Sequence, residues 1–108
     1  MTVFRIRFMS AADSTMDDLE NGVPGTAKRL KQVRKALAFL SVDPRHPSLS
    51  SHEYESYPGY ARGTKVWDSY VSTGADAWRI YWVYGPNEKG DEGTEIPVIT
   101  ILEIGPHR

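Results

Sequence analysis

Hydrophobic and polar positions alternate at the start of the chain and take a helical spacing soon afterwards. Apolar side chains occupy one side of residues 3–8 as Phe4, Ile6 and Phe8, while the other side carries Arg5 and Arg7. This period of two predicts a half-buried strand. In residues 11–20, Met16 and Leu19 lie three apart among acidic residues, which predicts a short acidic helix or turn. The Asn-Gly-Val-Pro-Gly stretch at 21–25 ends it, because proline cannot continue a helix.

The strongest helical pattern runs to about residue 42. Its apolar residues recur on one helix face, at Leu30, Val33, Leu37 and Leu40. Thr26 precedes it as the predicted N-cap, and Asp43-Pro44 ends it. The same helix carries a run of basic side chains with no acidic residue among them: Lys28, Arg29, Lys31, Arg34 and Lys35. It is therefore the most strongly charged segment of the chain.

Residues 44–63 are rich in Pro, Ser, Gly, His and Tyr and show no long periodic pattern. A loop of this length is uncommon in a small domain, so we look for a short strand at residues 52–54. Three runs rich in branched and aromatic residues follow at 64–71, 77–84 and 96–104, and each predicts a strand. The stretches between them, 72–76 and 85–95, are predicted hairpin loops.

The predicted order is a strand, two helices and an antiparallel meander. We therefore expect a single α+β domain over residues 1–108, with the N-terminal strand and two helices packed on an antiparallel sheet of about four strands. The sheet face that meets the helices is either the Trp78, Ile80, Trp82 and Tyr84 side or the Tyr81 and Val83 side. The pattern alone leaves both open.

Composition narrows the function classes. The chain has 108 residues, 40% of them hydrophobic and 25% charged, which suits one domain. It has no cysteine, which excludes disulfides, thiolate zinc sites, iron–sulfur clusters and cysteine nucleophiles. A net charge of −1 excludes a uniformly basic surface, although basic and acidic residues are segregated along the chain. Arg5 and Arg7 interrupt any signal-peptide pattern and no apolar run spans a membrane, so we expect a soluble, cytoplasmic protein.

Few residues are candidates for chemistry. The chain has no phosphate-binding glycine loop, no His-Glu-x-x-His and no Gly-x-Ser-x-Gly, so we expect no cofactor. The spacing of His46, His52 and His107 matches no standard metal site, so we expect no metal. His107 follows the last predicted strand, and imidazole can both accept and donate a proton near neutral pH. Arg79 lies in an aromatic strand and either pairs with a carboxylate or clamps a phosphate.

Four segments together resemble the RelE/ParE toxin superfamily. They are Arg45-His46-Pro47-Ser48-Leu49, the strand at 66–71, Trp78-Arg79-Ile80-Tyr81-Trp82, and the run from Ile99 to Ile104-Gly105-Pro106-His107. The ending is similar to that of the YafQ and HigB branches. The resemblance implies the toxin of a bacterial type II toxin–antitoxin pair, an endoribonuclease (mRNA interferase) that cuts mRNA on the ribosome. It implies metal-independent acid–base cleavage to a 2′,3′-cyclic phosphate, with a cognate antitoxin, the ribosome and mRNA as partners.

The same resemblance assigns residues. Arg79 matches the strand arginine at the scissile phosphate, His107 matches the C-terminal general acid, and His46 is similar to a contributing loop histidine. Candidate RNA-binding residues are Lys28, Arg29, Lys31 and Lys35 on the basic helix, and His52, Arg62 and Lys65 by location. Two other functions remain open, a ParE-like inhibitor of DNA gyrase and a nontoxic protein-binding module on the same fold.

Overall fold

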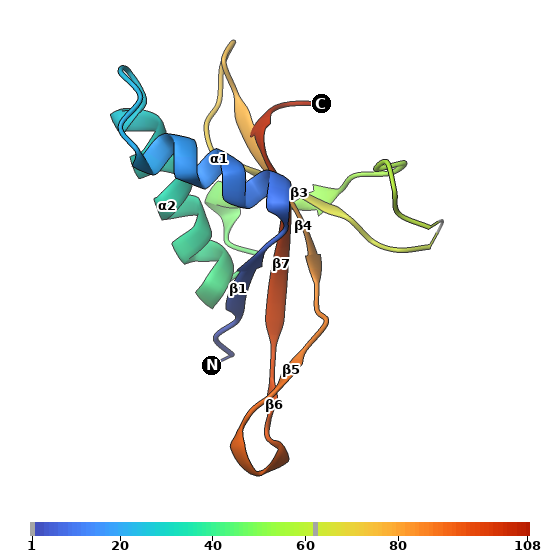
Figure 1. Ribbon diagram of the computed structural model, residues 1–108. Coiled ribbons are helices and arrows are strands. Elements are labelled where there is room, and N and C mark those ends of the chain that lie inside the picture. Colours follow the sequence, from blue (N-terminus) through green and yellow to red (C-terminus); the bar gives the residue numbers. More distant parts are fainter. Residues whose placement is uncertain (1, 62) are drawn as a thin grey trace.

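A five-stranded sheet with two helices on one face forms the body of the protein (Figure 1). The computed structural model describes residues 2–61 and 63–108. The strand order is β1 (Arg5–Phe8), β7 (Val98–Pro106), β4 (Trp78–Tyr84), β3 (Trp67–Tyr70) and β2 (His52–Glu53). All neighbours are antiparallel except β1, which runs parallel to β7.

The α+β class is confirmed, but the prediction of an antiparallel sheet of about four strands is wrong. The sheet is mixed and has five strands. One reason is that β2 contains two residues, too few for a periodic signal, although it lies within the 52–54 stretch where a strand was sought. The other is that β1 pairs with a strand at the far end of the chain, so no local turn sets its direction.

Both helices form where the apolar spacing predicts them. Helix α1 (Ser10–Glu20) buries Ala12, Met16 and Leu19, and α2 (Ala27–Val42) buries Val33, Ala36 and Leu40. Leu30 and Leu37 are partly buried against the same core. Thr26 occupies the predicted N-cap position of α2, but its hydroxyl donates to the Val23 carbonyl at 2.6 Å instead of accepting from the helix. None of the described helices is long and apolar enough to cross a membrane.

The two faces of the sheet carry separate apolar clusters. Ile80 and Trp82 of β4 pack with the helices in the main core, which settles the question that alternation left open. Tyr81 and Val83 face the other way, where Tyr54 and Tyr57 of the 54–66 segment cover them. Tyr84, at the end of β4, is exposed.

A β-bulge in β7 explains why its apolar run does not alternate. The pairing register shifts between Tyr81 and Trp82, so Tyr81 pairs with Glu103 while Trp82 pairs with Ile101. Leu102 is the extra residue, and it joins the smaller cluster while Ile101 and Ile104 join the main core. The bulge thus lets β7 contribute apolar side chains to both faces.

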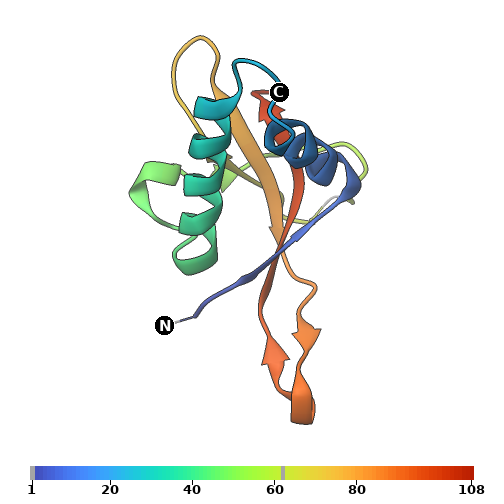
Figure 2. The same cartoon turned by 60° about the vertical axis from the view of Figure 1, so that its left-hand side comes forward.

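Two long connections differ from simple loops. Residues 44–63 contain the 3-10 turn η1 (Pro47–Leu49) before β2. Residues 85–95 were predicted to be a loop, but β5 (Glu88–Lys89) and β6 (Glu95–Ile96) pair there around the turn η2 (Asp91–Gly93). The resulting β5–β6 hairpin projects from the body at one end, while the C-terminus lies at the other (Figure 2).

Candidate functional site

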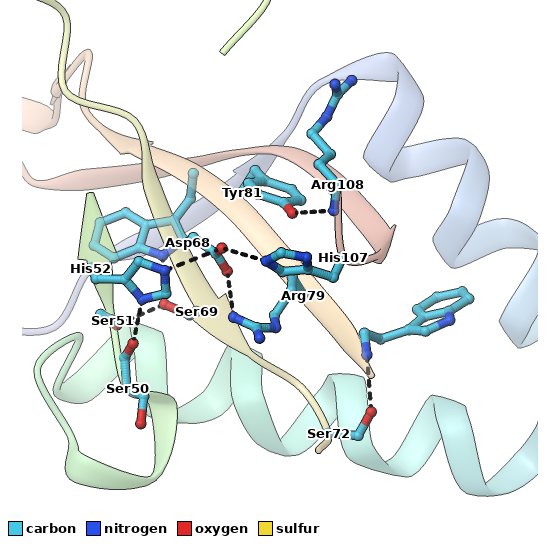
Figure 3. A network of polar contacts seen from close by, with 12 residues as sticks. Ser50, Ser51, His52, Asp68, Ser69, Ser72, Arg79, Tyr81, His107 and Arg108 are labelled. Carbon is cyan, nitrogen blue, oxygen red and sulfur yellow. Dashed lines mark hydrogen bonds and ion pairs between the residues drawn. The ribbon is translucent and has the colours of Figure 1, made fainter. Parts of the chain in front are cut away.

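A cluster of polar side chains lies on the sheet face opposite the helices, around Asp68 (Figure 3). Strand register brings it together, because Asp68 of β3 is paired with His52 on one side and with Tyr81 on the other. Arg79 pairs with Tyr70 of β3 and with Gly105 of β7, and His107 follows two positions after Gly105. Residues far apart in the chain thus meet at the same end of the sheet.

Asp68 is the fully buried centre of this cluster. Its Oδ1 accepts from Nη1 of Arg79 at 3.4 Å, and its Oδ2 lies 3.4 Å from Nε2 of His52. Nε2 of His107 lies 4.0 Å from the same Oδ2. Among the described residues Oδ2 has no hydrogen-bond partner. One buried carboxylate therefore faces an arginine and two imidazoles. The side chains of both histidines are half exposed to solvent.

Arg79 is held in a fixed orientation. Its guanidinium carbon lies 3.5 Å from the centre of the Tyr70 ring, a cation–π contact, and only 11% of its side chain is exposed. It is paired with a carboxylate, as one of the two sequence interpretations has it, but it is buried rather than facing outward. Its Nε has no hydrogen-bond partner among the described residues, so the pairing with Asp68 does not exhaust its donors.

His52 is oriented by a backbone contact. Its Nδ1 lies 2.9 Å from the carbonyl oxygen of Ser50. A carbonyl oxygen only accepts, so Nδ1 must carry the hydrogen, and Nε2 is the ring nitrogen that faces Asp68. The preceding segment is anchored by Ser51, whose hydroxyl donates to the Pro44 carbonyl and contacts the Ser69 hydroxyl at 2.6 Å.

His107 is positioned by the residues on either side of it. Its backbone N–H donates to the Ala77 carbonyl at 3.3 Å, and the next N–H, of Arg108, donates to the Tyr81 hydroxyl at 2.9 Å. Burial raises the pKa of Tyr81, and the Asp68 charge adds to this, so the phenol stays neutral. The Arg108 guanidinium also contacts Glu103 at 2.9 Å. The end of the chain is therefore tied to β4 and β7.

His46 lies elsewhere and is not brought together with His52 and His107. Its ring stacks on Phe39 with centroids 4.0 Å apart, and its Nδ1 accepts from the Ser48 N–H at 3.1 Å. It lines a separate cavity of about 350 Å³ together with Trp67 and Trp82. Its neighbours therefore differ from those of the Asp68 cluster.

The structure also separates the predicted RNA-binding residues. Lys28, Lys31 and Lys35 are exposed on α2, whereas Arg29 lines a cavity of about 390 Å³ with Arg79 and His107. Lys65 is exposed and forms an ion pair with Glu53 at 3.5 Å. Arg62 lies outside the described residues.

Protein-family models, curated proteins and solved structures were all compared with the chain. No match was found in any of them. The resemblance to the RelE/ParE superfamily therefore stays a prediction that rests on the quoted segments. The described residues contain no group of three or more His, Asp or Glu side chains arranged to hold a metal ion.

Asp68 and Tyr70 are not among the site residues predicted from the sequence. A usable signal was present, because Asp68 is an acid inside a strand of branched and aromatic residues, Val66 to Val71. A charge at such a position is costly to bury unless a partner is provided. His52 was proposed by location for RNA binding, and the structure places it instead beside the buried carboxylate.

Proposed function

We propose that this protein is an endoribonuclease that cleaves RNA by acid–base chemistry on its Asp68 cluster. The single observation that carries the proposal is the convergence of two half-exposed imidazoles and a fixed guanidinium on one buried carboxylate. Such a site contains a proton acceptor, a proton donor and a cation for a phosphate, which is what cleavage by a 2′-hydroxyl requires. The resemblance adds the substrate, mRNA on the ribosome, and a cognate antitoxin as the inhibitor.

The reaction can be assigned to individual residues. His52 takes the proton of the 2′-hydroxyl as the 2′-oxygen forms a bond to phosphorus. The bond from phosphorus to the 5′-oxygen breaks, and His107 gives that oxygen a proton. The products are a 2′,3′-cyclic phosphate and a 5′-hydroxyl. Arg79 stabilises the charge on the phosphate, and Asp68 accepts a hydrogen bond from Arg79 and lies beside both imidazoles.

This assignment uses His52 in the place that the resemblance gives to His46. His52 lies 3.4 Å from Asp68, whereas His46 is stacked on Phe39. A general base must lie within reach of the reacting group and be oriented by a neighbour, and His52 meets the second condition through the Ser50 carbonyl. His46 therefore serves as a matched control histidine.

The test is cleavage of an mRNA in a bacterial translation extract, with RNA ends mapped and the 3′ end analysed for cyclic phosphate. We expect cleavage by the wild type, and a rate about 10²-fold to 10⁴-fold lower for His107→Ala, His52→Ala or Arg79→Ala. His46→Ala should keep the wild-type rate. Circular dichroism of each variant checks that it is folded.

The outcome also separates the other two functions. If induced cells stop growing equally with the wild type and with His107→Ala and Arg79→Ala, acid–base cleavage is wrong, and DNA damage in those cells would favour gyrase inhibition. If none of the proteins affects growth or cuts mRNA in the extract, the Arg79–Asp68 pair is a structural ion pair in a binding module.

A further inference from the structure

A second cationic site adjoins the Asp68 cluster. The cavity of about 390 Å³ lies between the β3–β4 loop, the start of α2 and the end of β7, and it is lined by Arg29, Trp78, Arg79 and His107 among others. Its volume is within the range of pockets that bind small ligands. Arg79 and His107 also belong to the proposed catalytic cluster, so the cavity adjoins the place where the scissile phosphate would lie.

Two contacts fix the position of the Arg29 guanidinium at this cavity. Its guanidinium carbon lies 4.4 Å from the centre of the Trp78 ring, and its Nη1 donates to the backbone carbonyl of Asp76 at 3.0 Å. The indole fixes the plane of the guanidinium, and the carbonyl uses one of its five N–H donors. Because a carbonyl is neutral, this contact leaves the positive charge uncompensated.

Arg29 and Arg79 therefore differ in what they can still bind. Arg79 shares its charge with the buried Asp68 carboxylate, while Arg29 is held by an aromatic ring and a carbonyl. Both arginines and His107 are among the residues that line the cavity. The Asp76 side chain also lines the cavity and is exposed, and it opposes anion binding there. Since Arg29 covers the indole of Trp78, a phosphate fits this arrangement better than a stacked base does.

We propose that the cavity between Arg29 and His107 binds a second phosphate of the RNA, next to the scissile one. The inference rests on the proposed function, because it takes the scissile phosphate to lie at Arg79 and His107. It makes Arg29 a substrate-binding residue that distinguishes a longer RNA strand from a bare dinucleotide. Helix α2 then contributes to RNA binding at the site through Arg29.

Binding of non-cleavable RNA tests this without relying on catalysis. The probes are dinucleotides with a 2′-O-methyl group at the scissile position, carrying no terminal phosphate, a 5′-phosphate or a 3′-phosphate. Dissociation constants of the 108-residue protein for each probe are measured by NMR titration at two salt concentrations. We expect one of the two terminal phosphates to tighten binding about tenfold, the change expected for a charge-assisted hydrogen bond, and its position to show on which side of the scissile bond the cavity lies.

Variants decide whether Arg29 is responsible. Arg29→Ala should lose the gain from the terminal phosphate while binding the unphosphorylated dinucleotide as the wild type does. Asp76→Asn should increase the gain. Arg34→Ala removes one charge from an exposed position on the same helix and should leave the gain unchanged. The inference is overturned if Arg29→Ala keeps the gain, if Arg34→Ala loses it equally, or if neither terminal phosphate tightens wild-type binding. Failure of the proposed function would appear separately, as absence of mRNA cleavage in the extract.

Discussion

At the scale of single residues, the central feature is a carboxylate placed where it is costly to bury. Asp68 is fully buried in β3. The Arg79 guanidinium, which pairs with it, is also largely buried. Removing one partner of a buried pair leaves the other charge uncompensated, whereas replacing both by apolar residues is often neutral for stability. The pair therefore contributes little to net stability, and what sets it apart from a simple structural ion pair is the presence of two half-exposed imidazoles beside it.

This reasoning predicts a difference between single and double variants. Asp68→Leu alone should lower the free energy of unfolding by about 3–5 kcal/mol, because Arg79 stays buried without a counter-ion. The double variant Asp68→Leu, Arg79→Met should regain most of that loss and remain inactive in mRNA cleavage. Urea unfolding of the four proteins in the cycle measures the coupling. A double variant that costs as much as the sum of the two single variants would contradict the account.

The individual site residues differ in how far the sequence could predict them. Arg79 and His107 stand in short segments with a recognisable spacing, so the resemblance identified them. Asp68 and His52 become neighbours only through the β2–β3 register, and β2 is a two-residue strand inside a long irregular segment. No local pattern determines that register, so their convergence could not be predicted from sequence.

At the scale of elements, the clearest periodicity gave the most reliable prediction. The helices and the strands at β3, β4 and β7 follow from apolar spacing and β-branched content. The bulge in β7 could not be predicted, because the apolar run from Val98 to Leu102 is compatible with either face. The sequence predicts a loop in place of the β5–β6 hairpin, because the two strands contain two residues each and the segment is acidic.

The β5–β6 hairpin is tied to the body by one acidic residue. Glu88 of β5 accepts hydrogen bonds from Arg5 at 2.9 Å and Arg7 at 2.7 Å, both on β1. These hydrogen bonds lower the pKa of Glu88 to about 2 from an ordinary value of 4.5. A lowered carboxyl pKa in the folded state means that the stabilisation is complete above the unfolded value and is lost as the pH falls towards the folded value.

We therefore expect the stability advantage of the wild type over Glu88→Gln to be constant above pH 5. It should shrink between about pH 4.5 and pH 2, as Glu88 becomes protonated in the wild type. Urea unfolding at several pH values measures it. Glu92→Gln, at the exposed tip of the hairpin, is the control, and its stability difference from the wild type should not shrink as the pH falls. An advantage that stays constant down to pH 2 would show that the β1–β5 contact is not formed in solution.

At the scale of the whole molecule, the distribution of charge matters more than its sum. The acidic β5–β6 hairpin projects from the end of the body opposite the C-terminus and the β3–β4 loop (Figure 2). The site lies near the C-terminus and the β3–β4 loop, because Arg29, Arg79 and His107 line one cavity together with residues of that loop. A net charge of −1 therefore does not describe the field at the site, which is set by the guanidinium and imidazole groups there together with the Asp68 and Asp76 carboxylates. A near-neutral chain can still present a cationic cavity to RNA.

The sheet also divides the molecule into two apolar clusters with different consequences for the site. Two neighbouring residues of β7 belong to different clusters. Ile101 packs under the helices, whereas Leu102 packs with Tyr81 and Tyr54 on the other face of the sheet. Both are buried, so Ile101→Ala and Leu102→Ala should each lower the free energy of unfolding by about 2–5 kcal/mol in urea.

Their effects on function should differ. The 54–66 segment directly follows β2, so a cavity at Leu102 loosens the cover of the face on which His52 lies. We expect Leu102→Ala to speed amide hydrogen exchange in residues 54–61 and to reduce mRNA cleavage per folded molecule. Ile101→Ala should leave both near the wild-type values at a temperature where it is folded. Equal exchange and equal cleavage in the two variants would show that the smaller cluster does not position the site.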